Sequence, residues 1–153
     1  MAARPSAGYR LDIGGRIDRS HPLSFRWNGR SLPAFAGDTI ASALLANGVR
    51  IVGRSMKLHR PRGILSAGIE EPNALMTIGN GALIEPNARA TMVPVREGLE
   101  VRAQNCWPNV EFDLGRAFDA TSPLWPAGFY NKTFIWPSWH FYEGLIRRAA
   151  GLG

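Results

Sequence analysis

The first alternation of apolar and polar residues along the chain predicts a β-hairpin. Residues 25–27 read Phe-Arg-Trp, and apolar positions resume at Leu32 and Phe35. The Asn28-Gly29 pair between the two runs suits a type I′ turn, because both residue types accept a positive φ. We therefore expect two antiparallel strands joined at Asn28-Gly29.

Residues 40–46 then show the period of a short helix. From Ile40, apolar side chains recur at i+3 and i+4, which places them on one side of a helix of two to three turns. Asp38 is the expected N-cap, because its carboxylate can accept hydrogen bonds from the first-turn amides. The Asn47-Gly48 pair is expected to end the helix, since both residue types favour the left-handed conformation found there.

Further strand-like runs follow a long segment that has no period. Residues 53–74 contain three glycines and two prolines. We expect them to form a loop, and loops of this length inside a domain are usually functional. The strand-like runs after it are 75–78, 82–84, 90–95 and 99–103. The first two are expected to pair through a turn at Gly79-Asn80-Gly81, and Pro94 restricts the third to an edge or a bulge.

The order of hairpin, helix, long loop, hairpin and strands predicts an α+β fold, because strands and helices do not alternate. This order is typical of a β-grasp domain, and we assign residues 21–104 to it. Residues 1–20 are rich in glycine, arginine and serine and show no period. We expect them to form an N-terminal arm.

From residue 105 the composition changes to aromatic side chains interrupted by proline. Eleven aromatic residues lie between Trp107 and Tyr142, with prolines at 108, 123, 126 and 137. This spacing excludes one long helix, so residues 105–143 are expected to form an extended arm whose rings fill pockets in a partner or a second domain. A short helical piece is expected at 143–150, and the whole segment 105–153 is assigned to this C-terminal arm.

Length and cysteine content narrow the class of protein. A chain of 153 residues with 45% hydrophobic residues suits one compact domain with a tail. Cys106 is the single cysteine, so no disulfide can form within the chain, and a reducing cytosol is the expected compartment. No apolar stretch has the form of a secretory signal or approaches the roughly 20 residues of a membrane span. We expect a cytoplasmic chain without a membrane partner.

The net charge of +6 is concentrated in one segment. Residues 50–62 carry five cations and no acid, and four of these cations are the candidate anion contacts: Arg54, Lys57, Arg60 and Arg62. Arginine presents a planar fork that matches phosphate or carboxylate oxygens, and lysine adds a point charge. A solvated surface is the plainer interpretation. Nucleic acid is disfavoured because no aromatic residue is interleaved with the charges from Val52 to Gly81.

Other candidate chemistry is weak. The run Gly79-Asn80-Gly81 begins like a dinucleotide fingerprint, but the third glycine is replaced by Ile84, which favours a hairpin turn. Cys106 has no base beside it in sequence, so we interpret it as structural. The adjacent carboxylates Glu70 and Glu71 are expected to neutralise nearby arginines and not to act as an acid–base pair.

The three histidines do not form a metal motif. They are His21, His59 and His140, and they are far apart in sequence. With one cysteine and no cluster of carboxylates and histidines, a zinc or iron site is not expected. Only His59 lies in a segment with chemical character, the basic loop.

Residues 37–81, GDTIASALLANGVRIVGRSMKLHRPRGILSAGIEEPNALMTIGNG, closely resemble the N-terminal region of the alpha subunit of heterotetrameric sarcosine oxidase. Supporting segments lie at 14–17, 85–91, 126–134 and 146–153. The resemblance covers nearly the whole chain after residue 12 and depends on several long segments in the same order.

This resemblance implies a 2Fe-2S ferredoxin-type β-grasp domain that lacks its cluster. Related oxidoreductase subunits carry four cysteines, and the corresponding positions here are Ser66, Glu71, Ala74 and Thr91. None of the four is a cysteine, and iron–sulfur clusters need thiolates or, as the usual substitute, histidine. We therefore expect no metal in this loop.

The resemblance also implies what the rest of such a subunit does. The family's alpha subunit continues into a dinucleotide-binding domain and a folate-binding, aminomethyltransferase-like domain. The holoenzyme oxidatively demethylates sarcosine with FAD, FMN and NAD and can pass the methyl carbon to tetrahydrofolate. No flavin, NAD or folate motif lies within these 153 residues, so we expect no catalytic residue and no cofactor held by this chain alone.

The expected role is therefore assembly, as one piece of a sarcosine oxidase-type alpha subunit or as a split subunit. The domain would pack on the dinucleotide-binding domain and on other subunits, with the aromatic arm across those surfaces. The four cations would face a flavin phosphate or an acidic partner surface. Three alternatives stay open: direct contact with a redox cofactor, a free-standing basic module that binds nucleic acid or another polyanion, and a retained metal site.

Overall fold

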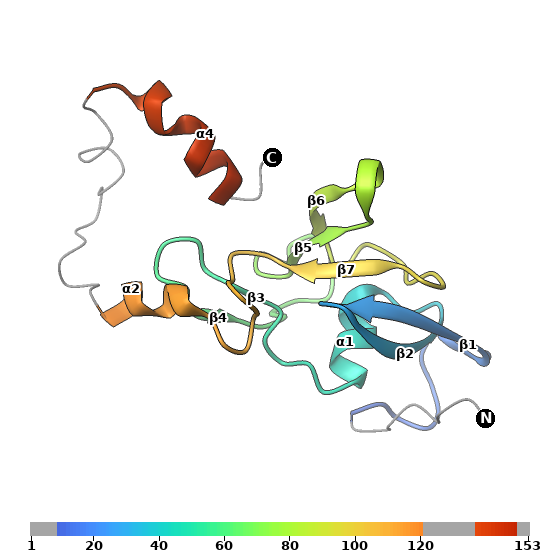
Figure 1. Cartoon of the computed structure of the whole chain (residues 1–153). Helices are drawn as coiled ribbons and strands as arrows, with labels where there is room; N and C mark the ends of the chain where they lie inside the picture. Colours follow the sequence, from blue (N-terminus) through green and yellow to red (C-terminus); the bar gives the residue numbers. More distant parts are fainter. Residues whose placement is uncertain (1–8, 121–136, 150–153) are drawn as a thin grey trace.

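The computed structural model describes residues 9–120 and 137–149. Within them it shows an α+β domain with a mixed five-stranded sheet in the order β2-β1-β7-β5-β6 and a separate two-stranded sheet of β3 and β4 (Figure 1). Strands β1 and β7 are parallel, and the other neighbours in the large sheet are antiparallel. The arrangement is consistent with a ferredoxin-like β-grasp domain.

The predicted first hairpin is confirmed. Strands β1 (Asp18–Trp27) and β2 (Arg30–Ala36) are antiparallel, and Trp27 lies opposite Arg30 at the turn. Asn28 and Gly29 have φ values of 46° and 83°, as a type I′ turn requires. Strand β1 begins before residue 21, so its first three residues lie in the stretch that was expected to be an arm.

Helix α1 (Ile40–Ala46) is confirmed, but its expected N-cap is wrong by one residue. The cap is Thr39, whose hydroxyl accepts from the Ser42 amide while Ser42 Oγ accepts from the Thr39 amide, a reciprocal capping box. Asp38 instead lies fully buried beside the cap. Gly48, with φ of 76°, follows the C-cap Asn47 as predicted.

The C-terminal half of the sheet differs from the sequence expectation in two places. Strands β5 (Leu75–Ile78) and β7 (Glu100–Ala103) are confirmed, but the expected strand at 82–84 is wrong. A 3-10 turn, η1 (Gly81–Leu83), occupies most of it, and the partner of β5 is β6 (Glu85–Arg89). The connection is therefore longer than a tight Gly-Asn-Gly turn.

The strand expected at 90–95 is also wrong. This segment turns back against the start of α1, where Ala90 and Val93 carbonyls accept from the amides of Ala41 and Ile40. Those amides belong to the first turn of α1, where the N–H groups have no acceptor within the helix itself. Ala90 and Val95 are buried in the core, whereas Met92 is exposed, and Pro94 makes an isolated bridge to Thr39.

The long loop at 53–74 contains more structure than its sequence indicated. Strands β3 (Gly53–Arg54) and β4 (Pro61–Arg62) pair antiparallel and hold the basic residues on a small hairpin. Residues 63–74 then form an irregular loop that leads into β5.

The core lies between the large sheet and α1, which packs on one face of it (Figure 1). Its largest fully buried side chains include Phe25 of β1, Ile40 and Leu44 of α1, and Met76 of β5. Val110, which follows the sheet in sequence, is fully buried in the same core.

The N-terminal segment before β1 is held to the domain by one buried ion pair. Arg10 donates to both oxygens of Asp38 at 3.1 and 2.8 Å, and its guanidinium lies over the Phe35 ring. Asp38 also accepts from Ser42 Oγ and from the Phe35 amide, so its buried charge has four hydrogen-bond donors.

The C-terminal segment contains short helices where the structure describes it. After β7 come η2 (Leu114–Arg116) and α2 (Ala117–Ala120), and then α4 (Trp139–Ala149). The helix expected at 143–150 thus begins four residues earlier, and the aromatic residues at 139, 141 and 142 are helical, not extended. The aromatic residues between 121 and 136 lie outside the described residues. None of the described helices is long and apolar enough to cross a membrane.

Candidate functional site

The irregular loop before β5 is organised around the side chain of Glu71. This carboxylate is fully buried, with 0% of its surface exposed. Oε2 accepts from the amides of Leu65 and Ser66 at 2.7 and 2.5 Å. Oε1 accepts from the amides of Asn73 and Ala74 at 2.7 and 3.1 Å. The loop therefore wraps around an anion that it supplies itself.

These contacts correct the expected role of Glu71. The side chain does not neutralise an arginine; its four described partners are backbone N–H groups. Burial alone raises the pKa of Glu71, but the four N–H donors outweigh it and hold the pKa below its ordinary value. The carboxylate is therefore charged at neutral pH inside a ring of amide dipoles, whereas Glu70 beside it is exposed.

Two side chains, one at the end of β6 and one just after it, bind the other side of this loop. Thr91 Oγ1 donates to the Gly68 carbonyl at 2.8 Å, and the Arg89 guanidinium donates to the Ile69 carbonyl. The structure thus brings together all the positions that the resemblance equates with cluster ligands, which are Ser66, Glu71, Ala74 and Thr91.

The residues present do not fit an iron–sulfur cluster. A cluster would require thiolates at this loop and would use the inward-facing amides to stabilise its sulfides. Here the amides are already taken by Glu71, and the chain's one cysteine, Cys106, follows β7 instead. No group of three or more potential metal-ligating side chains occurs in the part of the chain that the structure describes.

Cys106 has the environment of a structural thiol. It is half-buried, and burial followed by the nearby carboxylate of Asp113 raises the pKa of the Cys106 thiol above its ordinary value. A thiol with a raised pKa stays protonated at neutral pH and is a poor nucleophile or metal ligand. This agrees with the structural interpretation made from the sequence.

The basic loop places its four candidate cations in different surroundings. Arg54 is buried, and its guanidinium donates to the carbonyls of Val110, Glu111 and His59 at 2.7–3.3 Å. These partners are neutral, so Arg54 ties the basic loop to residues 110–111. The guanidinium is charged but its described donors point at protein carbonyls, which makes Arg54 a poor candidate for an external anion.

The remaining three cations are closer to solvent. Arg60 is exposed and donates to Asp119 of α2 at 2.8 Å, a surface ion pair of small energetic value. Arg62 is exposed on β4, and Lys57 lies at the tip of the hairpin between β3 and β4. Contact of these three side chains with an anion stays a prediction.

Another buried carboxylate, which the sequence did not indicate, joins the segment after β7 to the basic loop. Asp113 is 7% exposed, and its Oδ2 lies 2.7 Å from Nδ1 of His59. Its Oδ1 accepts from the amides of Trp107 and Gly115. Burial raises the pKa of Asp113, but these donors together hold it below its ordinary value. No sequence signal joins His59 to an aspartate 54 residues away, so only the fold reveals this pair.

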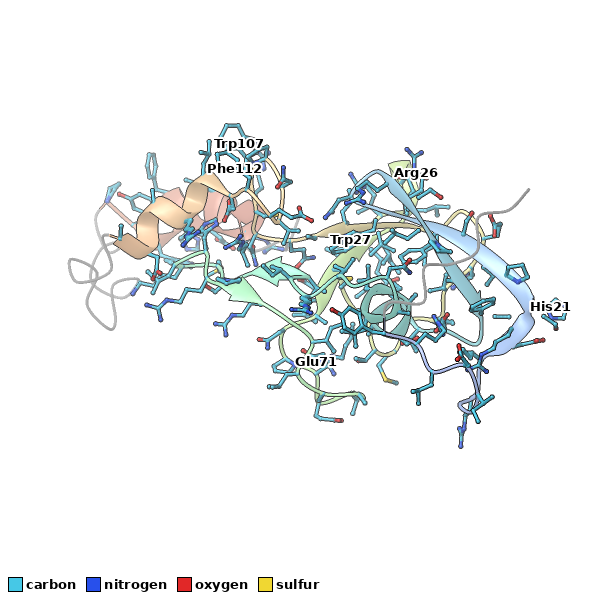
Figure 2. All side chains as sticks on the ribbon, turned by 90° about the horizontal axis from the view of Figure 1, so that it is seen from below. His21, Arg26, Trp27, Glu71, Trp107 and Phe112 are labelled. Carbon is cyan, nitrogen blue, oxygen red and sulfur yellow. The ribbon has the colours of Figure 1, made fainter. Side chains whose placement is uncertain are left out.

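The same segment presents two large rings to solvent. Trp107 and Phe112 are 68% and 65% exposed, and Figure 2 shows them together at one side of the molecule. Between them the loop is tightly bonded: the Leu114 amide donates to the Trp107 carbonyl, and Asn109 Oδ1 accepts from the Phe112 amide. The buried side chains of Arg54 and Asp113 also bond to the backbone of this segment and hold its shape.

Comparison with known proteins shows which family of domains this chain belongs to. Residues 20–106 match the family of 2Fe-2S iron-sulfur cluster binding domains, and the chain belongs to this family. With one cysteine in the chain, it is a member without a cluster site. It is homologous to the N-terminal region of the sarcosine oxidase alpha subunit.

Two curated relatives carry that homology. The chain is 57% identical over 150 residues to sarcosine oxidase subunit alpha of Rhizobium meliloti, covering 96% of this chain and 15% of the relative. It is 53% identical over 89 residues to the same subunit of Corynebacterium sp. strain U-96, covering 56% of this chain and 9% of the relative. The chain thus spans less than a sixth of the length of the curated relatives it matches.

Among solved structures, the chain is similar to L-proline dehydrogenase from P. horikoshii. The TM-score is 0.46 with 26% identity, and the match covers 57% of this chain and 16% of that one. A likeness at this TM-score supports no functional argument.

Proposed function

We propose that the chain is the N-terminal structural portion of a sarcosine oxidase-type alpha subunit, a ferredoxin-like β-grasp domain that serves assembly and not electron transfer. The observation that carries this proposal is the Glu71 carboxylate, which fills the loop that would otherwise surround a cluster. A domain whose cluster loop is filled by its own carboxylate keeps the β-grasp shape but has no redox centre that could carry electrons.

The activity of the whole protein belongs to the same proposal. The identity with the Rhizobium meliloti subunit supports a role in a multi-subunit enzyme that oxidatively demethylates sarcosine. FAD, FMN, NAD and tetrahydrofolate would be held by other domains and subunits, because this chain corresponds to only 15% of that relative. The compartment would be the cytoplasm.

The surface that would meet those other parts is the exposed aromatic loop at 107–112. Trp is the residue most enriched at interface hot spots, and a loop held rigid before binding loses little entropy on docking. Lys57, Arg60 and Arg62 of the basic loop would face an acidic partner surface or a flavin phosphate beside it. The described part of the proposed 105–143 arm would thus act as a preformed contact, joined to the domain through Asp113.

Assembly and metal content test this proposal together. The chain should be co-expressed with the remainder of the Rhizobium meliloti alpha subunit, and the complex should be analysed by size-exclusion chromatography and for iron and acid-labile sulfide. We expect a complex with no stoichiometric iron. Replacing Trp107 and Phe112 with alanine should weaken the complex at least about tenfold, since two exposed hot-spot rings contribute more than about 1.4 kcal/mol.

A matched control is Leu83→Ala, which removes an apolar side chain that is even more exposed but lies on η1. This variant should assemble like the wild type. Stoichiometric iron in the wild-type complex, or a Trp107→Ala/Phe112→Ala variant that assembles unchanged, would contradict the proposal. Steeply salt-dependent binding of the isolated chain to oligonucleotides would favour the nucleic-acid alternative instead.

A further inference from the structure

Three Asn-Gly pairs occur in the chain, and the fold places them in different surroundings. They are Asn28-Gly29, Asn47-Gly48 and Asn80-Gly81. Asparagine is a thermolabile residue, and in such a pair the glycine nitrogen can attack the side-chain carbonyl carbon, because no Cβ on the glycine obstructs the approach. The reaction releases ammonia and needs neither an enzyme nor a cofactor. The local structure therefore decides which of the three pairs reacts.

Asn28 is bonded to strand β7 through both its side chain and its backbone. Its Oδ1 accepts from the Ala103 amide, and its own amide donates to the Val101 carbonyl, each at 2.9 Å. These bonds fix the side-chain and backbone torsions of Asn28. The Gly29 nitrogen can reach the side-chain carbon only after the turn has opened.

The second pair is held still more firmly at the end of α1. Asn47 Nδ2 donates to the carbonyls of Pro33 and Ala43 at 2.8 and 2.7 Å. The Gly48 amide, whose nitrogen would be the nucleophile, donates to the Leu45 carbonyl at 2.9 Å. Attack at this pair requires the loss of hydrogen bonds from both reacting groups.

Asn80-Gly81 has neither constraint. Both residues are exposed between β5 and η1, and the Asn80 side chain makes no capping hydrogen bond to η1. A Cβ at Gly81 would meet nothing described within 4 Å, so the nucleophile lies in open space. Asn80 is extended, with ψ of 164°, and ring closure requires rotation about this angle. Gly79 and Gly81 flank it, both at positive φ, and glycine accommodates such a rotation at little cost.

We propose that Asn80-Gly81 is a site of spontaneous deamidation in the folded chain. The Gly81 nitrogen bonds to Asn80 Cγ and gives up its proton, while the Cγ–Nδ2 bond breaks and ammonia leaves. Water then opens the cyclic imide at either of its two carbonyls, which yields aspartate or isoaspartate. No oxidant or reductant takes part. This inference does not depend on the assembly role, because it uses a different part of the domain.

The modification would change both the charge and the shape of the connection between β5 and β6. Either product adds a carboxylate close to Arg102, whose guanidinium donates to the Gly79 carbonyl at 3.3 Å. Isoaspartate also lengthens the backbone by one carbon inside the turn that the Leu83 amide closes on the Asn80 carbonyl. An aged chain would therefore carry a more acidic and looser connection at this edge of the sheet.

Peptide mapping by mass spectrometry tests this site selection. The folded full chain, kept at mildly alkaline pH, should accumulate aspartate and isoaspartate at Asn80 at least about tenfold faster than at Asn28 or Asn47, since those two must first give up hydrogen bonds of the fold. In urea the three pairs should react at similar rates, because without the fold they are the same dipeptide.

Variants identify the source of the acidic product. Asn80→Gln should remove most of the acidic species that appears on isoelectric focusing after incubation. Asn109→Gln changes another exposed asparagine, one followed by valine, and should leave that species unchanged. An intact Asn80 after incubation, or equal rates at the three pairs in the folded chain, would overturn the proposal. A preference for Asn80 that persists unchanged in urea would overturn it as well, because the fold would then not be its cause.

Discussion

The carboxylate of Glu71 accepts a hydrogen bond from the backbone N–H of Ser66 at 2.5 Å. The resemblance to cluster-bearing domains equates both positions with cluster cysteines, and here the side chain at one of them binds the backbone at the other. The three further N–H donors complete a ring around the carboxylate. Backbone amides that converge on one point form an anion site, and here the anion is covalently part of the chain.

The first prediction concerns the free energy of unfolding. Glu71→Gln keeps the shape of the side chain but replaces one acceptor oxygen by an NH₂ group that faces two amide donors. We expect a loss of at least about 3 kcal/mol, because two charge-assisted bonds are lost and two buried donors are left without an acceptor. Urea denaturation followed by circular dichroism measures it.

The control for this prediction is Glu70→Gln. Glu70 is the exposed neighbour of Glu71, and surface substitutions of this kind usually change stability by less than about 0.5 kcal/mol. Equal stability of Glu71→Gln and the wild type would show that the buried carboxylate is not needed to hold the loop.

The second prediction is a pH dependence. The pKa values of Glu71 and Asp113 are lower in the folded chain than the ordinary values that they take on unfolding. Below the ordinary values, near pH 4, the unfolded chain binds protons that the folded chain does not, so the free energy of unfolding falls as pH decreases. Stability from both groups is fully present above that pH and is lost as pH falls through the lowered folded values.

Urea titrations between neutral pH and pH 3 test this dependence. Glu71→Gln should show a shallower decrease than the wild type, since one of the carboxylates whose pKa is lowered on folding is gone. Parallel curves for the two proteins would contradict the assignment of the lowered pKa to Glu71.

The third prediction concerns the N-terminal segment. Arg10→Met leaves the buried charge of Asp38 with two of its four hydrogen bonds, and removing one partner of a buried ion pair costs about 3 kcal/mol. The variant should also be cleaved faster by protease before β1. Arg26→Met removes an exposed pair with Glu100 at 3.5 Å and a long, exposed hydrogen bond to the Gly29 carbonyl at 3.4 Å, and should cost under about 0.5 kcal/mol. Similar losses in both variants would refute the special role of Arg10.

The fourth prediction tests the contact between the basic loop and the segment after β7. A Cβ atom at Gly115 would lie 2.3 Å from the His59 ring, so Gly115→Ala must displace His59 from Asp113. We expect a loss of about 2 kcal/mol and altered NMR shifts of the His59 ring. Gly144→Ala in α4 meets nothing within 4 Å and should instead add up to about 1 kcal/mol of helix stability. Unchanged His59 shifts in Gly115→Ala would contradict the described contact.

Parts of the fold that depend on local chemistry followed from the sequence. The turn at Asn28-Gly29, the end of α1 at Gly48 and strands β5 and β7 were all found from residue type and spacing, because neighbouring residues determine them. The N-cap was missed because Asp38 and Thr39 are both good caps. The ion pair with the distant Arg10 holds the Asp38 side chain in the interior, which leaves Thr39 as the cap.

Features that depend on distant parts of the chain could not be found in this way. The run at 90–95 has the alternation of a strand, yet its carbonyls serve the first turn of α1, which is brought there only by folding. The Glu71 site combines one side chain with four amides, and amides leave no trace in a sequence. The resemblance indicated an empty ligand loop; the structure shows what fills it.

Hydrogen exchange of the four amides around Glu71 tests the central claim most directly. If the carboxylate holds the loop, the N–H groups of Leu65, Ser66, Asn73 and Ala74 should be protected in the wild type to the level of the sheet, without any added metal. In Glu71→Gln the four should exchange much faster than amides of β1 and β2. Fast exchange of these amides in the wild type, or protection that survives in Glu71→Gln, would contradict it.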